Sequence, residues 1–321
     1  MLLSVKNLSI SFATDNGVIE AVRNISFNID KNEVLGVVGE SGCGKSITNL
    51  ALMGLLPKEA IVTADELIFD GLNLLDISEK KWSVIRGKKI GMIFQDPMSA
   101  LNPCFSIRYQ LEEAIRSNHP GIPNDQIYPK AIDLLSMVGI PDPKARIESY
   151  PHEMSGGMAQ RVMIAMAISG HPKLLIADEP TTALDVTIQL QILKLLKEIQ
   201  RKTQMSIIFV SHDLNVISKM SDRIQVMYAG EIVEKGQNKD IISSSLHPYS
   251  RGLLKSLPGM NSTEEALYSI PGIVPDLKDR PKGCQFAPRC DYVTNECQQD
   301  TLITISQEND HSWKCINPVK D

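Results

Sequence analysis

An eight-residue stretch, Gly39-Glu40-Ser41-Gly42-Cys43-Gly44-Lys45-Ser46, constrains the fold more than any other feature of this sequence. It follows the apolar run Val34–Val38 and precedes a helix-like pattern, which is the context that a phosphate-binding P-loop requires. Glycines let the backbone approach a phosphate without a Cβ clash, and the start of the helix attracts the anion. In such a loop Lys45 lies against the β and γ phosphates and Ser46 ligates Mg²⁺. A chance glycine-rich turn is the alternative, and the flanking strand and helix argue against it.

Short strand-like runs alternate with helix-like runs up to about residue 235, which is typical of a parallel sheet flanked by helices. We expect strands at Leu3–Phe12, Ala21–Ile29, Val34–Val38, Lys89–Phe94, Leu174–Ala177, Ile207–Val210 and Ile224–Tyr228. We expect helices at Lys45–Met53, Ile107–Ser117, Gln126–Met137, Gly157–Ser169, Thr187–Arg201 and Asp213–Met220. Strand signals are absent between Gln95 and Gly157, which predicts a helical insertion in the α/β unit.

Length and composition exclude several classes of protein. A chain of 321 residues suggests about two domains at roughly 150 residues each, and 43% hydrophobic residues supply a core. A net charge of -5 gives no basic field for nucleic acid, so DNA and RNA are not expected partners. The longest apolar runs, such as Val162–Ile168, fall short of the roughly 20 residues that span a bilayer, and no secretory signal opens the sequence. We therefore expect a cytosolic protein without structural disulfides.

Two acids end a strand of the buried type. The apolar run Leu174–Ala177 leads directly into Asp178 and Glu179. Ligands bind at the C-terminal edge of the strands in α/β sheets, so both acids suit a nucleotide site. We expect Asp178 to help hold Mg²⁺ and Glu179 to act as general base on the attacking water. An acid-rich turn is the alternative, and it loses weight beside a P-loop.

A second glycine-rich helix start lies far beyond the P-loop. Ser155, Gly156 and Gly157 place a capping serine and two glycines before the helical run, a geometry that binds anions. One nucleotide already has its cradle in Gly39–Ser46. A second phosphate-binding helix start makes sense if it closes on a nucleotide held by another subunit.

With these motifs the sequence resembles the ATP-binding subunit of an ABC transporter over residues 1–235. The family motifs stand in the family order: P-loop Gly39–Ser46, glutamine loop at Gln95, signature Ser155–Gln160, Walker B strand Leu174–Asp178 with Glu179, the loop Ala183–Asp185 and the switch histidine His212. The resemblance implies an α/β fold, the P-loop NTPase cassette, with a mixed-sheet core and a helical subdomain at about residues 96–157. The sequence departs from the family pattern at Met158–Gln160, since the commonest signature has glutamine directly after the two glycines.

Four motif residues also have simpler explanations. Gln95 alone is a polar residue at a strand end, and His212 alone is a capping residue. The resemblance instead implies that Gln95 senses Mg²⁺ and water and that His212 contacts the γ-phosphate and holds Glu179 in line. Phe12 is either a core aromatic or a ring that stacks on adenine. Asp185 is either a helix cap or, as the resemblance implies, a residue at the seam between two ATPase subunits.

Two further segments narrow the resemblance to peptide importers. Phe94–Pro103 and His247–Ser250 are both similar to dipeptide and oligopeptide permease ATPases, and the variant signature agrees with this branch. Residues 236–321 are expected to form its small, irregular, cysteine-rich C-terminal appendage, so that the likeness spans essentially the entire chain. Importers of nickel and of antimicrobial peptides belong to the same branch, which leaves the substrate open.

Four of the six cysteines lie in this turn-rich tail, namely Cys284, Cys290, Cys297 and Cys315. A weakly apolar tail does not easily build a core of its own, and a metal staples it. By count, four thiolates suit Zn²⁺ and an iron–sulfur cluster equally, although no Cys-x2-Cys or Cys-x4-Cys pair is present. The segment Gly283–Cys290 resembles branch members with a four-iron cluster, which favours [4Fe-4S] over zinc and over free thiols.

The resemblance implies an ATPase bound peripherally at the cytoplasmic face of the inner membrane, where it powers import of di- or oligopeptides. The implied partners are two transmembrane permease subunits, an extracytoplasmic binding protein and a second homologous, non-identical ATPase. Two ATPases sandwich two ATP molecules, with Mg²⁺ on Ser46, Gln95 and Asp178. The rival hypotheses are an ABC ATPase without a membrane partner and a metal-sensing regulator in which the tail dominates.

Overall fold

The computed structural model describes residues 1–14, 17–182, 184–257, 268–299 and 305–319. The chain divides into two compact units, each built from segments that are not contiguous in sequence. Unit 1 comprises Met1–Asp30, Val34–Asp76 and Phe209–Asp321, and unit 2 comprises Lys31–Glu33 and Ile77–Ile208. Of the predicted loop Ala183–Asp185, Ala183 lies outside the described residues.

One sheet of unit 1 is antiparallel. Its long strands β1 (Leu3–Thr14) and β2 (Gly17–Ile29) are separated by two residues, which suffice for a hairpin, whereas a parallel connection needs about a dozen residues. This antiparallel pairing agrees with the mixed-sheet core that the resemblance implies. Strands β4 (Ala60–Thr63) and β5 (Glu66–Phe69) also pair with β1, and β6 (Leu72–Asn73) pairs with β5.

The second sheet of unit 1 is mixed and carries the predicted P-loop. Its strand order is β12-β13-β11-β10-β3, with bounds Ser306–Glu308, His311–Trp313, Glu231–Gln237, Arg223–Tyr228 and Val34–Val38. Strands β3 and β10 are parallel, whereas the other pairs are antiparallel. Every residue of β3 is buried, and α9 (Leu214–Met220) packs on it. The strand that leads into the loop Gly39–Ser46 is thus fixed on its edge by β10 and on a face by a helix.

The tail has more regular structure than the sequence predicts. The predicted appendage boundary near residue 236 falls inside β11, whose other neighbour is β13 from the far end of the chain. The remaining helices of unit 1 are α1 (Lys45–Leu52), α10 (Asn238–Ser244), α11 (Pro248–Lys255) and the 3₁₀ turns η2 (Ala287–Arg289) and η3 (Asn295–Gln298).

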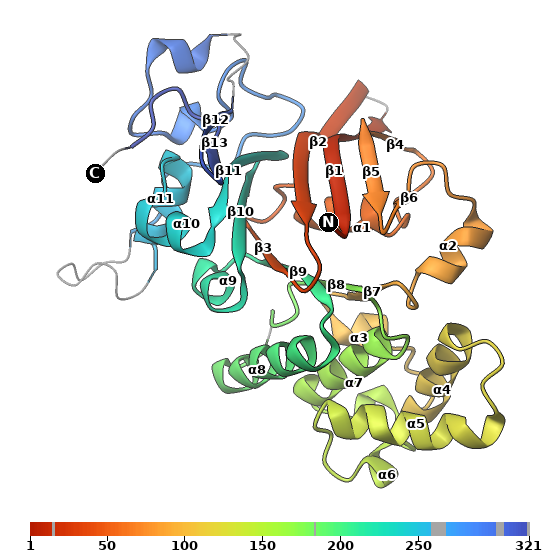
Figure 1. The fold of residues 1–321 in the computed structure, drawn as a ribbon. Helices are drawn as coiled ribbons and strands as arrows, with labels where there is room; N and C mark the ends of the chain where they lie inside the picture. The colour runs from red at the N-terminus through yellow and green to blue at the C-terminus, as the bar shows by residue number, and fades with distance from the viewer. Residues whose placement is uncertain (15–16, 183, 258–267, 300–304, 320–321) are drawn as a thin grey trace. The chain divides into compact units, whose positions relative to one another are not determined.

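Unit 2 is largely helical. Its strands β7 (Ile90–Ile93) and β8 (Leu174–Asp178) are parallel, and residues 94–173 between them, all of which are described, form helices and turns only. The helices are α2 (Glu79–Ile85), α3 (Pro97–Ala100), α4 (Ile107–Asn118), α5 (Asn124–Met137), α6 (Pro143–Arg146), η1 (Pro151–Glu153), α7 (Gly156–Ile168) and α8 (Val186–Thr203). Helices α4, α5 and α7 pack against one another, as the yellow and light-green ribbons of Figure 1 show.

The chain passes from unit 2 to unit 1 inside β9 (Ser206–Ser211). The predicted strands and helices thus all have counterparts at closely similar bounds, with β3 reproduced residue for residue. Among the described residues, no helix combines the length and the apolar character that a membrane crossing requires.

Candidate active site

The loop Gly39–Ser46 in unit 1 has the backbone that a phosphate cradle needs. Gly42 and Gly44 take φ of 79° and 100°, in the left-handed region that favours glycine. Gly39 is constrained by space instead, because a Cβ there would lie 2.2 Å from the backbone oxygen of Met227 in β10. The loop therefore starts in close contact with the backbone of β10, turns at two glycines and leads directly into α1.

Lys45 is held inside this loop. Its side chain is buried, and Nζ donates hydrogen bonds to the carbonyl oxygens of Gly39 at 2.8 Å and Glu40 at 3.0 Å. Ser46, the next residue, is exposed. A cation fixed at the N-terminus of a helix is suited to a phosphate ligand. Cys43 is buried, and burial raises the pKa of its thiol above the usual value, so this cysteine is a packing residue and not a nucleophile.

Two residues of the C-terminal segment contact the loop, and sequence reasoning missed both. The backbone N–H of Glu40 donates to the Tyr249 hydroxyl at 2.9 Å. The Arg289 guanidinium donates from Nη1 to both carboxylate oxygens of Glu40, at 2.9 and 3.1 Å. The available sequence signals were that Tyr249 stands in a branch-specific segment and that Arg289 directly precedes Cys290.

Phe12 and His212 also lie in unit 1. Phe12 is half-buried in β1, which fits neither a fully buried core ring nor a free one. His212 is exposed in the turn between β9 and α9. The helix cap of α9 is Asp213, whose side chain accepts from the Asn215 N–H at 2.8 Å. The simple interpretation of His212 as the capping residue is therefore wrong.

In unit 2 the structure brings Gln95 and Glu179 together. Glu179 follows Asp178, the buried last residue of β8, and has a left-handed φ of 48°. Its Oε2 accepts hydrogen bonds from Gln95 Nε2 at 3.2 Å and from Thr182 Oγ1 at 2.9 Å. Thr182 was not predicted from the sequence. Two donors on one carboxylate oxygen hold the side chain in a fixed orientation, as a general base requires.

The predicted signature forms the start of α7. Ser155 caps this helix, accepting from the Met158 N–H at 3.3 Å, and both Ser155 and Gly156 are exposed. A Cβ on Gly157 would lie 2.8 Å from Ile188 Cγ2, so glycine here permits close packing of α7 and α8. Gln160 is 1% exposed, and its Nε2 has no hydrogen-bond partner within the described part of the chain. Such burial does not suit direct contact with a nucleotide held by another subunit.

Asp185 caps α8. Its Oδ1 accepts from the Ile188 N–H at 2.9 Å, and the residue is exposed. The simpler of the two predicted roles is therefore present in the structure, and exposure leaves the carboxylate accessible from outside the chain. A role at a subunit seam stays a prediction.

The four tail cysteines line one small cavity in unit 1 as free thiols, together with apolar residues such as Phe286. The Cys284 N–H donates to the Cys297 carbonyl at 2.8 Å, which joins two of the cysteine-bearing turns. Burial raises the pKa of Cys284 to about 11 and that of Cys315 to about 12, and the neighbouring thiols add to both shifts. In the described ranges, no three histidine, cysteine or acidic side chains are placed to hold a single metal ion.

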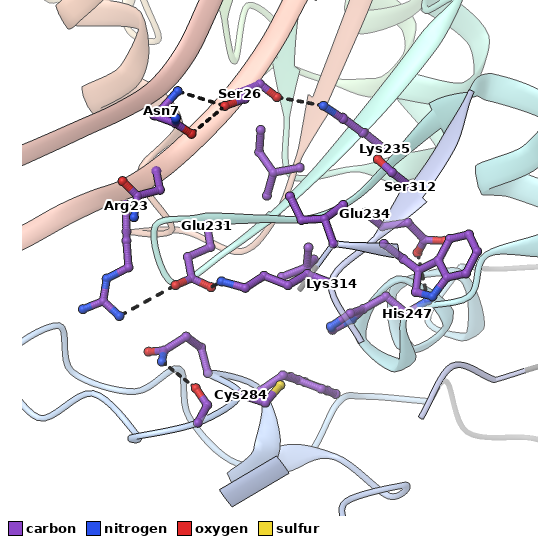
Figure 2. A pocket seen from close by; sticks show the side chains of 18 of the residues that line it. Asn7, Arg23, Ser26, Glu231, Glu234, Lys235, His247, Cys284, Ser312 and Lys314 are labelled. Carbon is purple, nitrogen blue, oxygen red and sulfur yellow. Dashed lines mark hydrogen bonds and ion pairs between the residues drawn. The ribbon is translucent and has the colours of Figure 1, made fainter. Parts of the chain in front are cut away.

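A second cavity, of about 350 Å³, lies beside Cys284 and His247 (Figure 2). It is lined by several cationic side chains, which alone would suggest an anion site. Glu231 forms ion pairs with Lys314 at 2.6 Å and with Arg23 at 3.8 Å, as the dashed lines in Figure 2 show. One carboxylate is therefore shared by two of the cationic side chains that line this cavity.

Comparisons with known proteins agree with the sequence resemblance. The family model described as "ABC transporter" matches residues 22–182, and the model described as "Oligopeptide/dipeptide transporter, C-terminal region" matches residues 233–297. The dipeptide transport ATP-binding protein DppD of Escherichia coli (strain K12) is 47% identical over 320 residues, which cover 100% of this chain and 98% of that protein. The oligopeptide transport ATP-binding protein OppD of Bacillus subtilis (strain 168) is 51% identical over 294 residues, covering 91% of this chain and 82% of that protein.

A solved structure shares the fold. It is a dimeric ATP-binding cassette in a post-hydrolysis state, bound to ADP and phosphate, and it matches with a TM-score of 0.66 at 27% identity. The match covers 74% of this chain and 99% of the cassette. The part of this chain outside such a cassette is therefore substantial, and the second family model falls largely within the C-terminal segment.

Proposed function

This chain belongs to the ATP-binding subunits of ABC transporters, in the oligopeptide and dipeptide branch, and from that membership we propose that it hydrolyses ATP to power the import of di- or oligopeptides. The observation that carries the proposal is the union, on one chain, of an ATP-binding cassette with the C-terminal region of this branch. The relative from Escherichia coli has the same full-length organisation, since the likeness covers both chains almost completely.

Within the cassette, we assign nucleotide binding to the loop Gly39–Ser46, with Lys45 on the β and γ phosphates. Phe12 is assigned to adenine. Mg²⁺ would be held by Ser46, Gln95 and Asp178, and when bound it neutralises charge on the phosphates. The exposure of Ser46 and the fixed ammonium of Lys45 support this assignment.

Hydrolysis is assigned to the carboxylate of Glu179. It takes a proton from water while the water oxygen attacks the γ-phosphorus, and the bond from that phosphorus to the bridging oxygen of ADP breaks, which yields ADP and inorganic phosphate. The hydrogen bonds from Gln95 and Thr182 to Oε2 support the role because they orient the carboxylate. His212 is assigned to the γ-phosphate, where its exposure in a turn leaves it accessible.

The second subunit supplies the start of α7 in this proposal. Ser155 and Gly156 are exposed at the N-terminus of a 13-residue helix, a position that favours an anion. Asp185 lies at the same seam. The partner ATPase is proposed to be a non-identical homologue, and two permease subunits and an extracytoplasmic binding protein complete the importer. The chain acts peripherally at the cytoplasmic face of the inner membrane.

We assign a [4Fe-4S] cluster to Cys284, Cys290, Cys297 and Cys315. Each thiolate of such a cluster binds a different iron atom, so the thiols surround a common space without meeting at one point. All four cysteines line one small cavity, and this shared position supports the assignment of a common group to them. When bound, such a cluster would connect the segments that carry the four cysteines and would supply one-electron redox chemistry.

Metal analysis tests this assignment. The chain is purified anaerobically, and iron, acid-labile sulfide and zinc are measured, with about four irons and four sulfides per chain expected. Cys284→Ser is expected to lose them, whereas Cys104→Ser, at an exposed cysteine outside the cavity, is the matched control and is expected to keep them. One zinc per chain, or no metal, would refute the cluster while leaving the ATPase assignment intact.

Reconstitution tests the transport function. The complex is assembled with its permease subunits and its partner ATPase in liposomes, and ATP hydrolysis is measured with the binding protein and either a dipeptide, an oligopeptide or Ni²⁺. Peptide uptake that depends on hydrolysis supports the proposal. Stimulation by Ni²⁺ alone would place the chain in the nickel-importing part of the branch. A separate pull-down from solubilised membranes that recovered ribosomes or DNA instead of permease subunits would contradict a transport role.

A further inference from the structure

An acidic residue stands inside the predicted phosphate loop. Glu40 is the second residue of Gly39–Ser46, and its side chain is 31% exposed. A carboxylate within a loop that binds a polyphosphate disfavours binding, because like charges repel each other. Nucleotide binding therefore requires that the charge of Glu40 be neutralised or held away.

Arg289 performs this task from the other end of the chain. Its side chain is 4% exposed, and Nη1 donates to both carboxylate oxygens of Glu40 at 2.9 and 3.1 Å. The other nitrogens of the guanidinium are fixed as well, because Nε donates to the Pro271 carbonyl at 2.8 Å and Nη2 to the Ile270 carbonyl at 3.3 Å. The cation is thus locked in one orientation, and the Glu40 carboxylate is locked with it.

The main chain of Glu40 is also hydrogen-bonded to the C-terminal segment. Its N–H donates to the hydroxyl of Tyr249, a fully buried residue of α11. The Tyr249 ring packs against those of Tyr228 and Phe286, with centroids 4.6 and 5.4 Å away. Phe286 belongs to the same tail segment as Arg289. The second position of the P-loop is therefore held by the tail through both its side chain and its backbone.

The turn that carries Arg289 lies between two of the cysteines. In η2, the Ala287 N–H donates to the Cys284 carbonyl at 3.0 Å, and the Cys290 N–H donates to the Ala287 carbonyl at 3.3 Å. Cys284 and Cys290 both line the small cysteine cavity. Whatever orders the thiols of this cavity also orders the backbone from which the Arg289 side chain extends.

We propose that Arg289 is a positioning residue of the ATP site. Through its ion pair with Glu40, the ordering of the four thiols in the cysteine cavity sets the affinity of the P-loop for ATP. The inference rests on the proposed function, because it takes ATP as the ligand of the loop. It adds a link from the C-terminal segment to the nucleotide that requires no second subunit. The tail thereby acts on nucleotide affinity through Glu40.

A double-mutant cycle on nucleotide affinity tests the first part of the proposal, that Arg289 acts on ATP binding through Glu40. The Kd for Mg·ATP is measured with the purified full chain carrying Arg289→Gln, Glu40→Gln or both changes. Arg289→Gln alone is expected to raise Kd about tenfold, because it leaves an uncompensated carboxylate in the loop, whereas the same change in the Glu40→Gln background is expected to raise Kd less than about twofold. Arg289→Lys keeps the charge without the planar fork, and it is expected to recover part of the affinity.

The outcomes separate the two hypotheses. A wild-type chain that bound no ATP would overturn the proposed function. Wild-type binding with an unchanged Kd in Arg289→Gln would overturn this inference alone. An equal loss of affinity in the presence and absence of Glu40 would also overturn it, because Arg289 would then only support the fold of the tail.

A substitution in the cysteine cavity tests the second part of the proposal, the link from the cavity to the P-loop. Cys284→Ser is expected to raise the Kd for Mg·ATP in the wild-type background, whereas Cys104→Ser is the control without effect. In the chain that already carries Glu40→Gln and Arg289→Gln, the effect of Cys284→Ser is expected to disappear, since its path to the loop is cut. An effect of unchanged size there would overturn the coupling, and thermal unfolding of each variant verifies that the chains compared are folded.

Discussion

Substituting alanine for Gly39 is the sharpest test of how the P-loop is seated. The added Cβ would lie 2.2 Å from the Met227 backbone oxygen and 2.8 Å from Cys43 Sγ, whereas ordinary contact begins at 3.4 Å. The loop and β10 must therefore separate by about 1 Å, and both are part of a packed interior that resists such shifts. Overpacking of this kind costs about 1–3 kcal/mol, so we expect a loss of that size in the free energy of unfolding.

Two further variants show which contact is responsible. In Gly42→Ala the new Cβ meets no atom within 4 Å beyond its own residue and its two chain neighbours, so the change carries only the strain of a φ of 79° and is expected to cost about 1 kcal/mol. Gly39→Ala combined with Cys43→Ala removes the sulfur contact and leaves the nearer clash with the backbone oxygen, so it is expected not to recover stability. Urea unfolding and the Kd for Mg·ATP are measured on each chain. Full recovery in the double variant, or a Gly39→Ala chain as stable as wild type, would refute the reasoning.

Three other changes test individual side chains. Glu179→Gln is expected to lower ATP turnover by about 10²–10⁴-fold, as measured by steady-state hydrolysis. ATP-dependent association, measured by light scattering, is expected to persist. Full hydrolytic activity would exclude Glu179 as the general base. Thr182→Val is expected to lower kcat about tenfold, because a hydrogen bond to a charged group is worth about 1.5 kcal/mol, whereas Thr182→Ser keeps the hydroxyl and the rate. Asp185→Ala is expected to cost about 1 kcal/mol of unfolding free energy through loss of the α8 cap, and Asp185→Asn is expected to retain it. Loss of ATP-dependent association in Asp185→Asn would show a role beyond capping, and equal stability of all three chains would exclude the cap.

Patterns with strong local causes were predictable from the sequence. The run Val34–Val38 is a strand because it is apolar throughout and is followed by Gly39, and the structure gives it the same bounds. Helix α7 begins at Gly156, one residue before the predicted start, because Ser155 supplies the cap. In both cases the residues that decide the element lie inside it or beside it.

Short strands without such local causes were missed. Strand β5 is only four residues long, and it exists because β1 offers it an antiparallel edge. Strand β13 has three residues and pairs with β11 across a separation of more than 70 positions. Neither has a periodic pattern of sufficient length, so only the completed sheet reveals them.

The residues of the candidate site also divide into those with a local sequence signal and those without one. Gln95 and Glu179 were predicted as separate motif residues, and the hydrogen bond between them follows from β7 and β8 being parallel neighbours whose C-terminal ends meet. Thr182 was missed because a threonine near a strand end has many uses. Arg289 was missed because an arginine beside a cysteine gives no sign of a carboxylate 249 positions away.

The position of Arg289 changes how the tail is understood. A turn-rich, weakly apolar segment was expected to need a metal because it lacks a core of its own, yet its strand β13 joins the sheet of β11, and its arginine is buried against the P-loop. Its stability therefore comes partly from the cassette, and the cassette in turn uses the tail to neutralise Glu40. An ion pair buried on one side is costly to break by removal of one partner, since the other charge is left without compensation. Replacement of such a pair by a well-packed apolar contact is often neutral or stabilising, so stability alone does not explain the charged contact, and this favours the proposed role of the ion pair in phosphate binding.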